Sequence, residues 1–525
     1  MVTDELRKYI TDSLRAGSPT VSIKQSLLES GWQSADIEEA FSTLGTVLAE
    51  QITPSKNQNK ATFTRRFARV GAIVAFIACV GAGVYVWQDQ LDLREANASK
   101  TREFYTRIAE SHISFTDSGT MVFPDEQKFL TEKNRYITEK TSFIEADLRA
   151  MTLTLYAEGA QTEQLQILSK GKERSWWETP TGNYSVLGKS VNGYSSIGRV
   201  WMPYSIQFYG NYLIHGWPHY DDGTPVSKGY SGGCIRLSDV DAKKIFDFAK
   251  VGMPILVLEE HLDRKFGTLL AKGEKAALPE IGAQAFLVQD IASGETLLEK
   301  NADEKRAVAS LTKLMTAVVA HEVIYLGRSV QTTSKLLAGA QMFTPVEGDR
   351  YIGLDLLYPL LMQSSNLSAK LLASFVGEGA FIGDMNAKAL SLEMKDTTFA
   401  DASGISAGNI STAKDLARLL QYIYFKRPFL FDISKGVMFE EVGILRIGDT
   451  IAVKDLKNVN EFLEYPDLIG VKNGKTTAAG ETMATVWNVE RPDGNVPVAI
   501  IVLGSEDRAK DTLRLHTWLT ENYAK

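Results

Sequence analysis

Hydrophobic and polar positions change their spacing several times along the chain, and each change predicts a different kind of structure. In residues 1–45, apolar side chains such as Leu6 and Ile10 recur at the spacing of helices that bury one face. A break at Gly17–Pro19 separates the first helical segment from the next. We therefore expect a small α-helical N-terminal module over 1–45, and the polar residues 46–66 are expected to form a linker.

An apolar run without charged residues extends from Val70 to Trp87. As a helix rising about 1.5 Å per residue it would be about 27 Å long, close to the thickness of a bilayer core. The charged residues just before it are basic, namely Lys56, Lys60, Arg65, Arg66 and Arg69. We expect a single transmembrane helix over 67–87, retained as an anchor in the cytoplasmic membrane, with the N-terminus in the cytoplasm and the catalytic domains outside. A buried core helix is the alternative interpretation.

After this run the pattern predicts a stalk and then a β domain. Residues 88–143 are rich in charge and helical in spacing, which is expected of a stalk. From residue 144, short alternating segments separated by glycine-containing turns predict a compact, mainly-β domain over 144–260. The predicted strands are 151–156, 165–168 and 184–187, with one helix at 239–250.

The last part of the chain has the pattern of an α/β domain. Residues 261–282 are expected to be a linker, and 283–525 a second exported domain. It begins with an alternating strand at 286–290 and a second at 296–299, and a long helix follows from Leu311. The whole chain is therefore predicted to be multidomain, which agrees with a length of 525 residues, too long for one hydrophobic core.

Composition narrows the classes of partner. The net charge is -7 and no basic stretch is interleaved with aromatic residues, so nucleic acid is not an expected partner. The two cysteines are Cys79, inside the apolar run, and Cys234, in the exported part. No disulfide within the exported part is therefore possible, and Cys234 is either an inert buried thiol or a reactive one.

The surroundings of Cys234 favour a nucleophile. A thiol is mostly protonated at neutral pH and needs a nearby base, which His215 can supply across the fold. Glycines before the cysteine, Gly232 and Gly233, let the backbone approach an acyl carbonyl, so nearby N–H groups can form an oxyanion site. Arg236 is a candidate either to hold the Ser231 loop or to face a substrate carboxylate.

The ordered motifs in this region resemble one enzyme family. The segment 177–182 with the sequence Trp-Glu-Thr-Pro-Thr-Gly, then Tyr184, then Ile214-His215-Gly216, then 231–237, resembles the L,D-transpeptidase (YkuD-type) catalytic domain. The resemblance implies that Cys234 is the nucleophile and His215 its base. It implies substrate-binding roles for Ser231, Gly233 and Arg236. The family often has histidine where Gly232 stands here, a departure at a variable position.

A metal site is the competing interpretation of the histidines. His219 follows His215 by four residues, a spacing that would direct both rings to one metal on a helix. Gly216 and Pro218 lie between them and disfavour a helix. We therefore expect neither a metal nor another cofactor.

A second candidate nucleophile begins the long helix. Ser310 and Lys313 lie on one face of its first turn, so a lysine with a pKa lowered by burial can accept the serine proton. The spacing alone is weak, because Ser169 with Lys172 and Ser411 with Lys414 show it too. Those two pairs are interpreted as accidental.

The sequence around Ser310 distinguishes it from the other pairs. Ser364-Ser365-Asn366, the loop 401–404 and the segment 470–476 follow in the order found in the penicillin-binding D-alanyl-D-alanine carboxypeptidases, which 283–525 resembles. The resemblance implies a serine β-lactamase-like α/β fold. It also implies that Ser310 is the acyl acceptor, Lys313 its base, Ser364 a proton relay, and that substrate is bound by Asn366, Lys472, Asn473 and Gly474.

One position departs from the carboxypeptidase pattern. The usual Lys-Thr-Gly is Lys472-Asn473-Gly474 here, and the missing threonine hydroxyl ordinarily helps to bind the terminal carboxylate. Asn473 can donate through its amide instead. A shifted alignment on 475–477 lacks the glycine, and a fold that binds peptidoglycan without turnover is a further alternative.

The two resemblances imply one substrate polymer. The leading hypothesis is a membrane-anchored enzyme in which Cys234 crosslinks tetrapeptide stems of peptidoglycan and Ser310 trims pentapeptide stems, with β-lactams as inhibitors. One alternative is an enzyme with a single activity whose other domain only binds the cell wall. Another is a sensor or scaffold that signals through residues 1–45. These residues weakly resemble UBA-like modules, and an unknown cytoplasmic protein is their expected partner.

Overall fold

The structure is a computed structural model, and it describes two parts of the chain. In the N-terminal part the described positions are 6, 8–11, 20–29, 32–33, 35–37 and 39–41. In the C-terminal part they are 126–523, apart from 174, 196–197, 260–268, 270–276, 278, 338–346, 438–445, 448–450, 453–455 and 493. The predicted transmembrane helix at 67–87 and the linker at 46–66 lie outside the described residues. Within the described residues, no helix has the length and apolar character needed to cross a membrane.

The chain divides into two compact units, Met1–Asp89 and Gln90–Lys525. The first contains helix α2 (Thr20–Glu29), which the spacing of apolar residues predicts. Apolar side chains of α2 form a small core with residues that precede and follow the helix in the chain. The core contains Leu6, Ile10, Ile23, Leu27, Ile37 and Ala40. The described positions of this module are helical except for 32–33, and its bounds at 1–45 stay a prediction.

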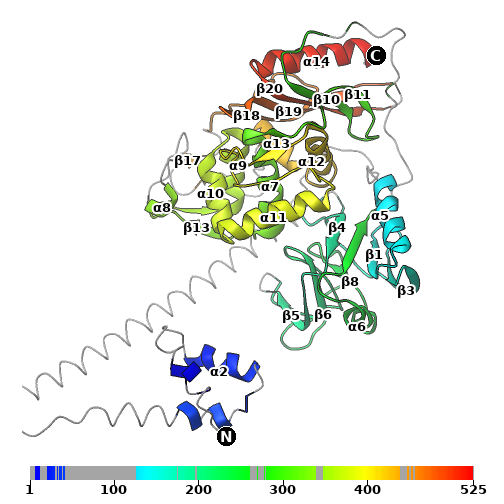
Figure 1. The fold of residues 1–525 in the computed structure, drawn as a ribbon, viewed down its shortest axis with the longest axis vertical. Helices are drawn as coiled ribbons and strands as arrows, with labels where there is room; N and C mark the ends of the chain where they lie inside the picture. Colours follow the sequence, from blue (N-terminus) through cyan, green and yellow to red (C-terminus); the bar gives the residue numbers. More distant parts are fainter. Residues whose placement is uncertain are drawn as a thin grey trace, which may run out of the picture. The chain divides into compact units, whose positions relative to one another are not determined.

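The second unit begins with a β domain that contains Cys234, called here the cysteine domain (described residues 126–259). Figure 1 shows its strands and two flanking helices. One sheet has the order β3-β2-β1-β9-β4 and the other the order β5-β6-β7-β8. The bounds are α5 (Glu126–Thr138), β1 (Phe143–Asp147), β2 (Thr152–Ala157), β3 (Ala160–Gln166), β4 (Gly182–Ser185), β5 (Gly188–Ser195), β6 (Val200–Tyr209), β7 (Tyr212–His215), β8 (Ile235–Arg236), α6 (Asp239–Phe248) and β9 (Pro254–Leu258).

The helix α5 comes from the segment expected to be a stalk. Its side chains Phe129 and Tyr136 pack against Phe143 and Tyr156 of the first sheet, and the rings of Phe143 and Tyr156 stack with centroids 4.2 Å apart. Burying these aromatic rings is favourable, so this end of 88–143 is part of the packed domain rather than a free stalk.

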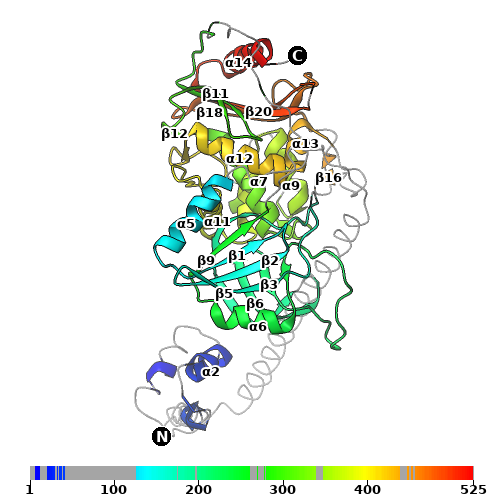
Figure 2. The ribbon, with the colours of Figure 1, turned by 90° about the vertical axis from the view of Figure 1, so that its right-hand side faces the viewer.

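The following domain contains Ser310 and is called here the serine domain (described residues 269–523). Its antiparallel sheet has the order β11-β10-β20-β19-β18. Helix α14 covers one face, and the other helices lie on the opposite face, between this sheet and the cysteine domain (Figures 1 and 2). The sheet strands are β10 (Ala285–Asp290), β11 (Thr296–Lys300), β18 (Leu468–Thr476), β19 (Gly480–Val489) and β20 (Val496–Ser505).

Helices and short ladders complete this domain. The helices are the 3-10 helix η1 (Ala309–Leu311), α7 (Thr312–Val323), α8 (Ser334–Leu337), α9 (Gly353–Met362), α10 (Asn366–Ser374), α11 (Glu378–Ser391), α12 (Ala413–Lys426), α13 (Phe429–Lys435) and α14 (Arg508–Tyr523). The ladders pair β12 (Arg306–Ala307) with β15 (Ile410–Ser411), β13 (Ser329–Gln331) with β14 (Arg350–Ile352), and β16 (Arg446–Ile447) with β17 (Ile451–Ala452). Helix α7 is buried on nearly all sides, as its apolar segment Ala317–Ala320 leads one to expect, and Lys313 and Glu322 are buried with it.

The two domains share a buried interface. Trp176 of the cysteine domain lies in the hydrophobic core of the serine domain, where its ring stacks on Phe429 with centroids 4.1 Å apart. Nearby, the ammonium of Lys426 pairs with the carboxylates of Glu178 and Glu259. A core residue of one domain thus completes the core of the other, and the paired charges around it are buried as well.

Candidate active sites

Strand pairing brings the residues of the cysteine site together. The parallel strands β7 and β8 align Ile214 with Ile235 and His215 with Arg236. Since side chains alternate across a strand, Cys234, one residue before Ile235, faces the same side as His215 and Arg236. Ile214 and Ile235 face the core, where both are buried. The sequence motifs are 19 residues apart, and the register places them on one surface.

Short hydrogen bonds fix the loop before Cys234. The hydroxyl of Ser231 donates to Cys234 O at 2.5 Å and accepts from Gly233 N at 3.1 Å. Thr179 donates to Gly233 O at 2.9 Å and accepts from Gly171 N at the same distance. Because the Gly233 N–H is used within the loop, it is not a donor for an oxyanion. A Cβ at Gly233 would lie 2.4 Å from the ring of Tyr212, which explains the glycine.

Burial sets the charge states of the two reacting groups. Nδ1 of His215 lies 2.6 Å from Gly216 O, and a carbonyl only accepts, so Nδ1 carries the proton and Nε2 is free to act as a base. Burial lowers the pKa of His215 to about 4, and the charge of Arg236 acts in the same direction. Burial also raises the pKa of the Cys234 thiol. The resting pair is therefore a neutral thiol and a neutral imidazole.

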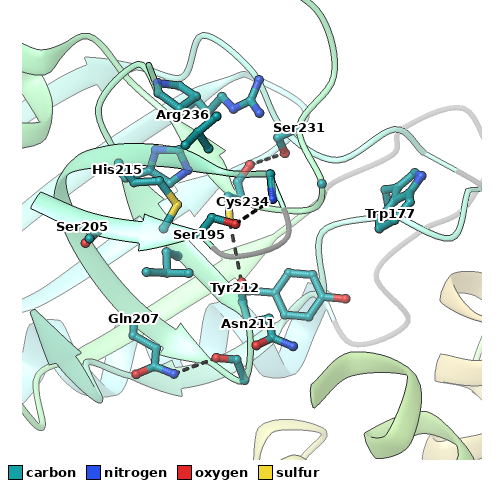
Figure 3. A pocket seen from close by; sticks show the side chains of 18 of the residues that line it. Trp177, Ser195, Ser205, Gln207, Asn211, Tyr212, His215, Ser231, Cys234 and Arg236 are labelled. Carbon is teal, nitrogen blue, oxygen red and sulfur yellow. Dashed lines mark hydrogen bonds between the residues drawn. The ribbon is translucent and has the colours of Figure 1, made fainter. Parts of the chain in front are cut away.

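The thiol faces a pocket of about 1000 Å³. Figure 3 shows Cys234 with His215 and Arg236 on one side and Asn211 and Tyr212 on the other. The thiol donates to Asn211 O over 3.7 Å. The guanidinium of Arg236 lies 5.6 Å from the centre of the Trp217 ring, and among the described residues its Nε has no hydrogen-bond partner. Arg236 therefore does not hold the Ser231 loop with that atom, and its charge is available to a substrate carboxylate.

In the serine domain the nucleophile and its base lie at the start of α7. Ser310 is in the 3-10 turn η1, and Lys313 is in the first turn of α7. Lys313 Nζ is 2.8 Å from Ser310 Oγ and 2.8 Å from Asn366 Oδ1. Three of the predicted site residues are thus in direct contact. Ser364 stands between α9 and α10 with a φ of 55°, a backbone conformation that few non-glycine residues adopt.

A loop outside the predicted site residues holds the lysine. Lys313 Nζ also donates to Ser403 O at 2.5 Å. This loop is closed by the carboxylate of Asp401, which accepts hydrogen bonds from Ser403 N, Gly404 N and Ser406 N. Burial lowers the pKa of Lys313 to about 7, although the charge of Asp401 acts against it. About half of the lysine is then neutral at pH 7, which is the state that a general base needs.

Strand β18 forms the other side of the serine site. A Cβ at Gly474 would lie 2.8 Å from Ser310 N, so the glycine lets the strand approach the nucleophile closely. Burial lowers the pKa of Lys472 well below its ordinary value, and the charge of Lys313 adds to this effect. The amide of Asn473 donates to Val459 O at 3.0 Å and to Glu461 at 2.5 Å. Its contact with substrate stays a prediction.

Comparison with known proteins agrees with these two arrangements. A family model described as D-alanyl-D-alanine carboxypeptidase matches residues 272–507, and one described as L,D-transpeptidase catalytic domain matches 141–257. A D-alanyl-D-alanine endopeptidase of Escherichia coli (strain K12) is 31% identical over 271 residues, which are 47% of this chain and 81% of that protein. The chain belongs to the D-alanyl-D-alanine carboxypeptidase family. An L,D-transpeptidase catalytic domain precedes the carboxypeptidase domain.

Other relatives match the same carboxypeptidase region. D-alanyl-D-alanine carboxypeptidase DacC of Escherichia coli (strain K12) is 30% identical over 271 residues, and the match spans 48% of this chain and 64% of that protein. A solved structure of D-alanyl-D-alanine carboxypeptidase from Mycobacterium tuberculosis H37Rv is 24% identical, with a TM-score of 0.40. It covers 48% of this chain and 95% of that chain.

The carboxypeptidase and transpeptidase motifs do not include every residue that builds the two sites. Thr179 lies in a motif recognised in the sequence, but its bond to the Cys234 loop was not expected. The backbone oxygens of Asn211 and Ser403 accept hydrogen bonds from Cys234 and Lys313, and no spacing in the sequence indicates these contacts. The loop 401–404 was recognised in the order of the carboxypeptidase motifs, but the contact of its Ser403 oxygen with Lys313 was not expected.

Proposed function

We propose that this chain is a membrane-anchored, bifunctional peptidoglycan-remodelling enzyme. Cys234 performs L,D-transpeptidation of tetrapeptide stems, and Ser310 performs D,D-carboxypeptidase trimming of pentapeptide stems. The observation that carries the proposal is the presence of two separate nucleophile and base pairs in one chain. Lys313 Nζ is 2.8 Å from Ser310 Oγ, and Cys234 shares one face of the β7–β8 pair with His215.

At the serine site, the neutral amine of Lys313 takes the proton of Ser310 as the oxygen attacks the carbonyl carbon of the penultimate D-alanine. The new bond joins Oγ to that carbon, and the peptide C–N bond breaks. The terminal D-alanine leaves with a proton, for which Ser364 is the proposed relay. Water then cleaves the ester, restores Ser310 and releases a tetrapeptide stem.

At the cysteine site, Nε2 of His215 takes the thiol proton as Sγ attacks the carbonyl of the third stem residue. A thioester forms, the C–N bond to the fourth residue breaks, and D-alanine leaves with the proton held by His215. An amine of a second stem then attacks the thioester, and the thiol is restored. Because both groups are neutral at rest, proton transfer accompanies the attack instead of preceding it.

The two reactions fit in sequence. The tetrapeptide released by the serine site is the acyl donor that the cysteine site requires, so one site supplies the other. The proposed anchor at 67–87 keeps both domains at the outer face of the cytoplasmic membrane, and the module at 1–45 is proposed to bind a cytoplasmic protein. β-Lactams are proposed to acylate Ser310, and carbapenems to acylate Cys234.

The test uses the full chain and defined muropeptides, with products read by mass. Wild type is expected to convert pentapeptide to tetrapeptide and to form crosslinked dimers. Cys234→Ala should accumulate tetrapeptide without dimers, and Ser310→Ala should form dimers from tetrapeptide only. Equal crosslinking of a pentapeptide-only substrate by Ser310→Ala and wild type would contradict the supply of one site by the other.

Covalent probes separate this proposal from the single-activity alternative. A carbapenem adduct on Cys234 and a fluorescent penicillin label on Ser310 are both expected, each lost in the matching alanine variant. If Cys234 is never acylated while Ser310 is, the cysteine domain serves only to bind the wall.

A further inference from the structure

The pocket of Cys234 is not built by the cysteine domain alone. Five of its lining residues come from the end of α7 and the turn that follows it in the serine domain, namely His321, Glu322, Ile324, Tyr325 and Leu326. They lie far outside residues 141–257, which match the transpeptidase family. One wall of this pocket is therefore specific to a chain in which the two domains are joined.

Direct contacts hold this wall against the nucleophile. The side-chain amide of Asn211 donates to Val323 O at 3.0 Å, and its backbone oxygen accepts from the Cys234 thiol. Gly210 beside it has a φ of 45°, and a Cβ there would lie 2.9 Å from Val323 Cγ1. The turn that positions the thiol is thus docked on the last residue of α7.

The wall is fixed because the domains are locked together behind it. Trp176 is buried at 4% exposure in the serine domain, and the neighbouring Trp177 lines the pocket. The charged side chains of Glu178 and Lys426, which pair across the interface, are 5% and 2% exposed. Moving the domains apart would expose the Trp176 ring to water, which is unfavourable, so this packing holds the wall beside the pocket.

Tyr325 is the residue of this wall best suited to bind a peptide. Its ring is partly exposed to the pocket, between the buried side chains Ile324 and Leu326. Burial and the nearby Cys234 raise the pKa of Tyr325 to about 12, so its hydroxyl keeps its proton. Among the described residues this hydroxyl makes no hydrogen bond. It is free to donate to a peptide carbonyl or to accept from an amide N–H.

We propose that Tyr325 of the serine domain is a specificity-determining residue of the Cys234 site, where it binds the peptide of the acyl-donor stem. This inference rests on the proposed transpeptidase function. The ring covers an apolar part of the stem, and the hydroxyl pairs with one of its amide groups. The cysteine site is then a composite site that is complete only when the serine domain is present.

The test compares Tyr325→Ala and Tyr325→Phe with wild type in the full chain. The substrate is a disaccharide-tetrapeptide donor with a fixed excess of acceptor, and kcat and KM are measured separately. Tyr325→Ala should raise the donor KM about tenfold and Tyr325→Phe about threefold, with kcat changed less than threefold. Leu390→Ala, which changes an exposed side chain of the serine domain that does not line the pocket, should leave both constants unchanged.

Two controls show that the variants are folded. The rate of Cys234 alkylation by iodoacetamide and penicillin labelling of Ser310 should stay within about twofold of wild type. An unchanged KM in both Tyr325 variants, or a loss of kcat alone, would overturn the inference and leave the proposed function intact. Absence of any transfer product from wild type would overturn the proposed function and this inference with it.

Discussion

Replacing Lys426 with methionine tests whether the buried charges between the domains hold them together. Lys426 ends α12, and its ammonium pairs with Glu178 at 2.5 Å and with Glu259. Burial lowers the pKa of Lys426, but the two carboxylates outweigh this effect and the net pKa is raised. In Lys426→Met, two carboxylates stay buried after losing the cation that both of them contact, although Lys170 still pairs with Glu259 and the charge of Arg427 still acts on Glu178.

Removing one partner of a buried ion pair costs about 3–5 kcal/mol, because an uncompensated charge stays away from water. Lys414→Met is the matched control, since Lys414 is on the same helix and pairs with Asp303, whose side chain is 76% exposed. Such surface pairs contribute about 0–1 kcal/mol. Urea unfolding of the full chain, followed by tryptophan fluorescence, gives the free energy of unfolding of each variant.

The pH dependence provides a second signature. In wild type the pKa of Glu259 is lowered by Lys426 and Lys170 against the effect of burial, so this carboxylate stabilises the fold above its unfolded pKa of about 4.3. That contribution is lost as the pH falls through the folded pKa. Without Lys426 the buried carboxyls take up protons more readily in the folded state, so the variant is relatively less stable at higher pH.

The difference in the free energy of unfolding between wild type and Lys426→Met should therefore be larger at pH 7.5 than at pH 4.5. A cost no greater than that of Lys414→Met, or a difference independent of pH, would refute the reasoning. Carbapenem acylation of Cys234 should also slow in Lys426→Met. Thr179, which follows Glu178 in the chain, donates a hydrogen bond to Gly233 O and so holds the loop before the cysteine.

Gly233→Ala should abolish carbapenem acylation of Cys234, because the φ of Gly233 is 102° and a Cβ there would meet an aromatic ring. In the control Gly232→Ala the Cβ meets no described atom within 4 Å, so the rate should stay within about twofold of wild type. Equal acylation rates of the two variants, measured by mass spectrometry, would contradict this. Penicillin acylation of Ser310 should be about thirtyfold slower at pH 5.5 than at pH 8, because Lys313, with a pKa of about 7, becomes protonated. The rate of carbapenem acylation at Cys234 should change less than threefold over the same range, because His215 has a pKa of about 4. Parallel pH profiles of the two rates would show that these bases are misassigned. Gly404→Ala should remove penicillin labelling of Ser310 but keep the carbapenem adduct on Cys234, because a Cβ at Gly404 would lie 2.0 Å from Ala309 O, next to the serine nucleophile. Normal penicillin labelling on a gel would refute that packing.

The sequence indicated the fold where local pattern determines it. Alternation predicted the strands near 152–157 and 285–290, and helical spacing predicted α7 and α6 within two residues. The three Ser-x-x-Lys pairs show where spacing alone is insufficient. Lys313 is fully buried, whereas Lys414 pairs with exposed acidic residues, and this difference in burial determines which amine can be a base.

Contacts between distant segments could not be read from the sequence. The bond from Lys313 to Ser403 O joins residues 90 positions apart, and that from Asn211 to Val323 O joins residues 112 apart. A backbone oxygen carries no residue signature, so no motif identifies these partners. The buried pair of Glu178 and Lys426 is equally hidden, because each residue looks like a surface charge until the domain interface buries it.

Helix α7 gives the two sites a common support without giving them a common chemistry. It starts beside Ser310 and ends at Val323, whose carbonyl holds Asn211 and thereby the Cys234 thiol. A helix of this length spans about 18 Å, so the two nucleophiles are held by opposite ends of one rigid element. Their bases titrate independently, because burial sets each pKa within its own domain. Changes that disturb α7 should thus impair both reactions, while changes to either nucleophile should impair one.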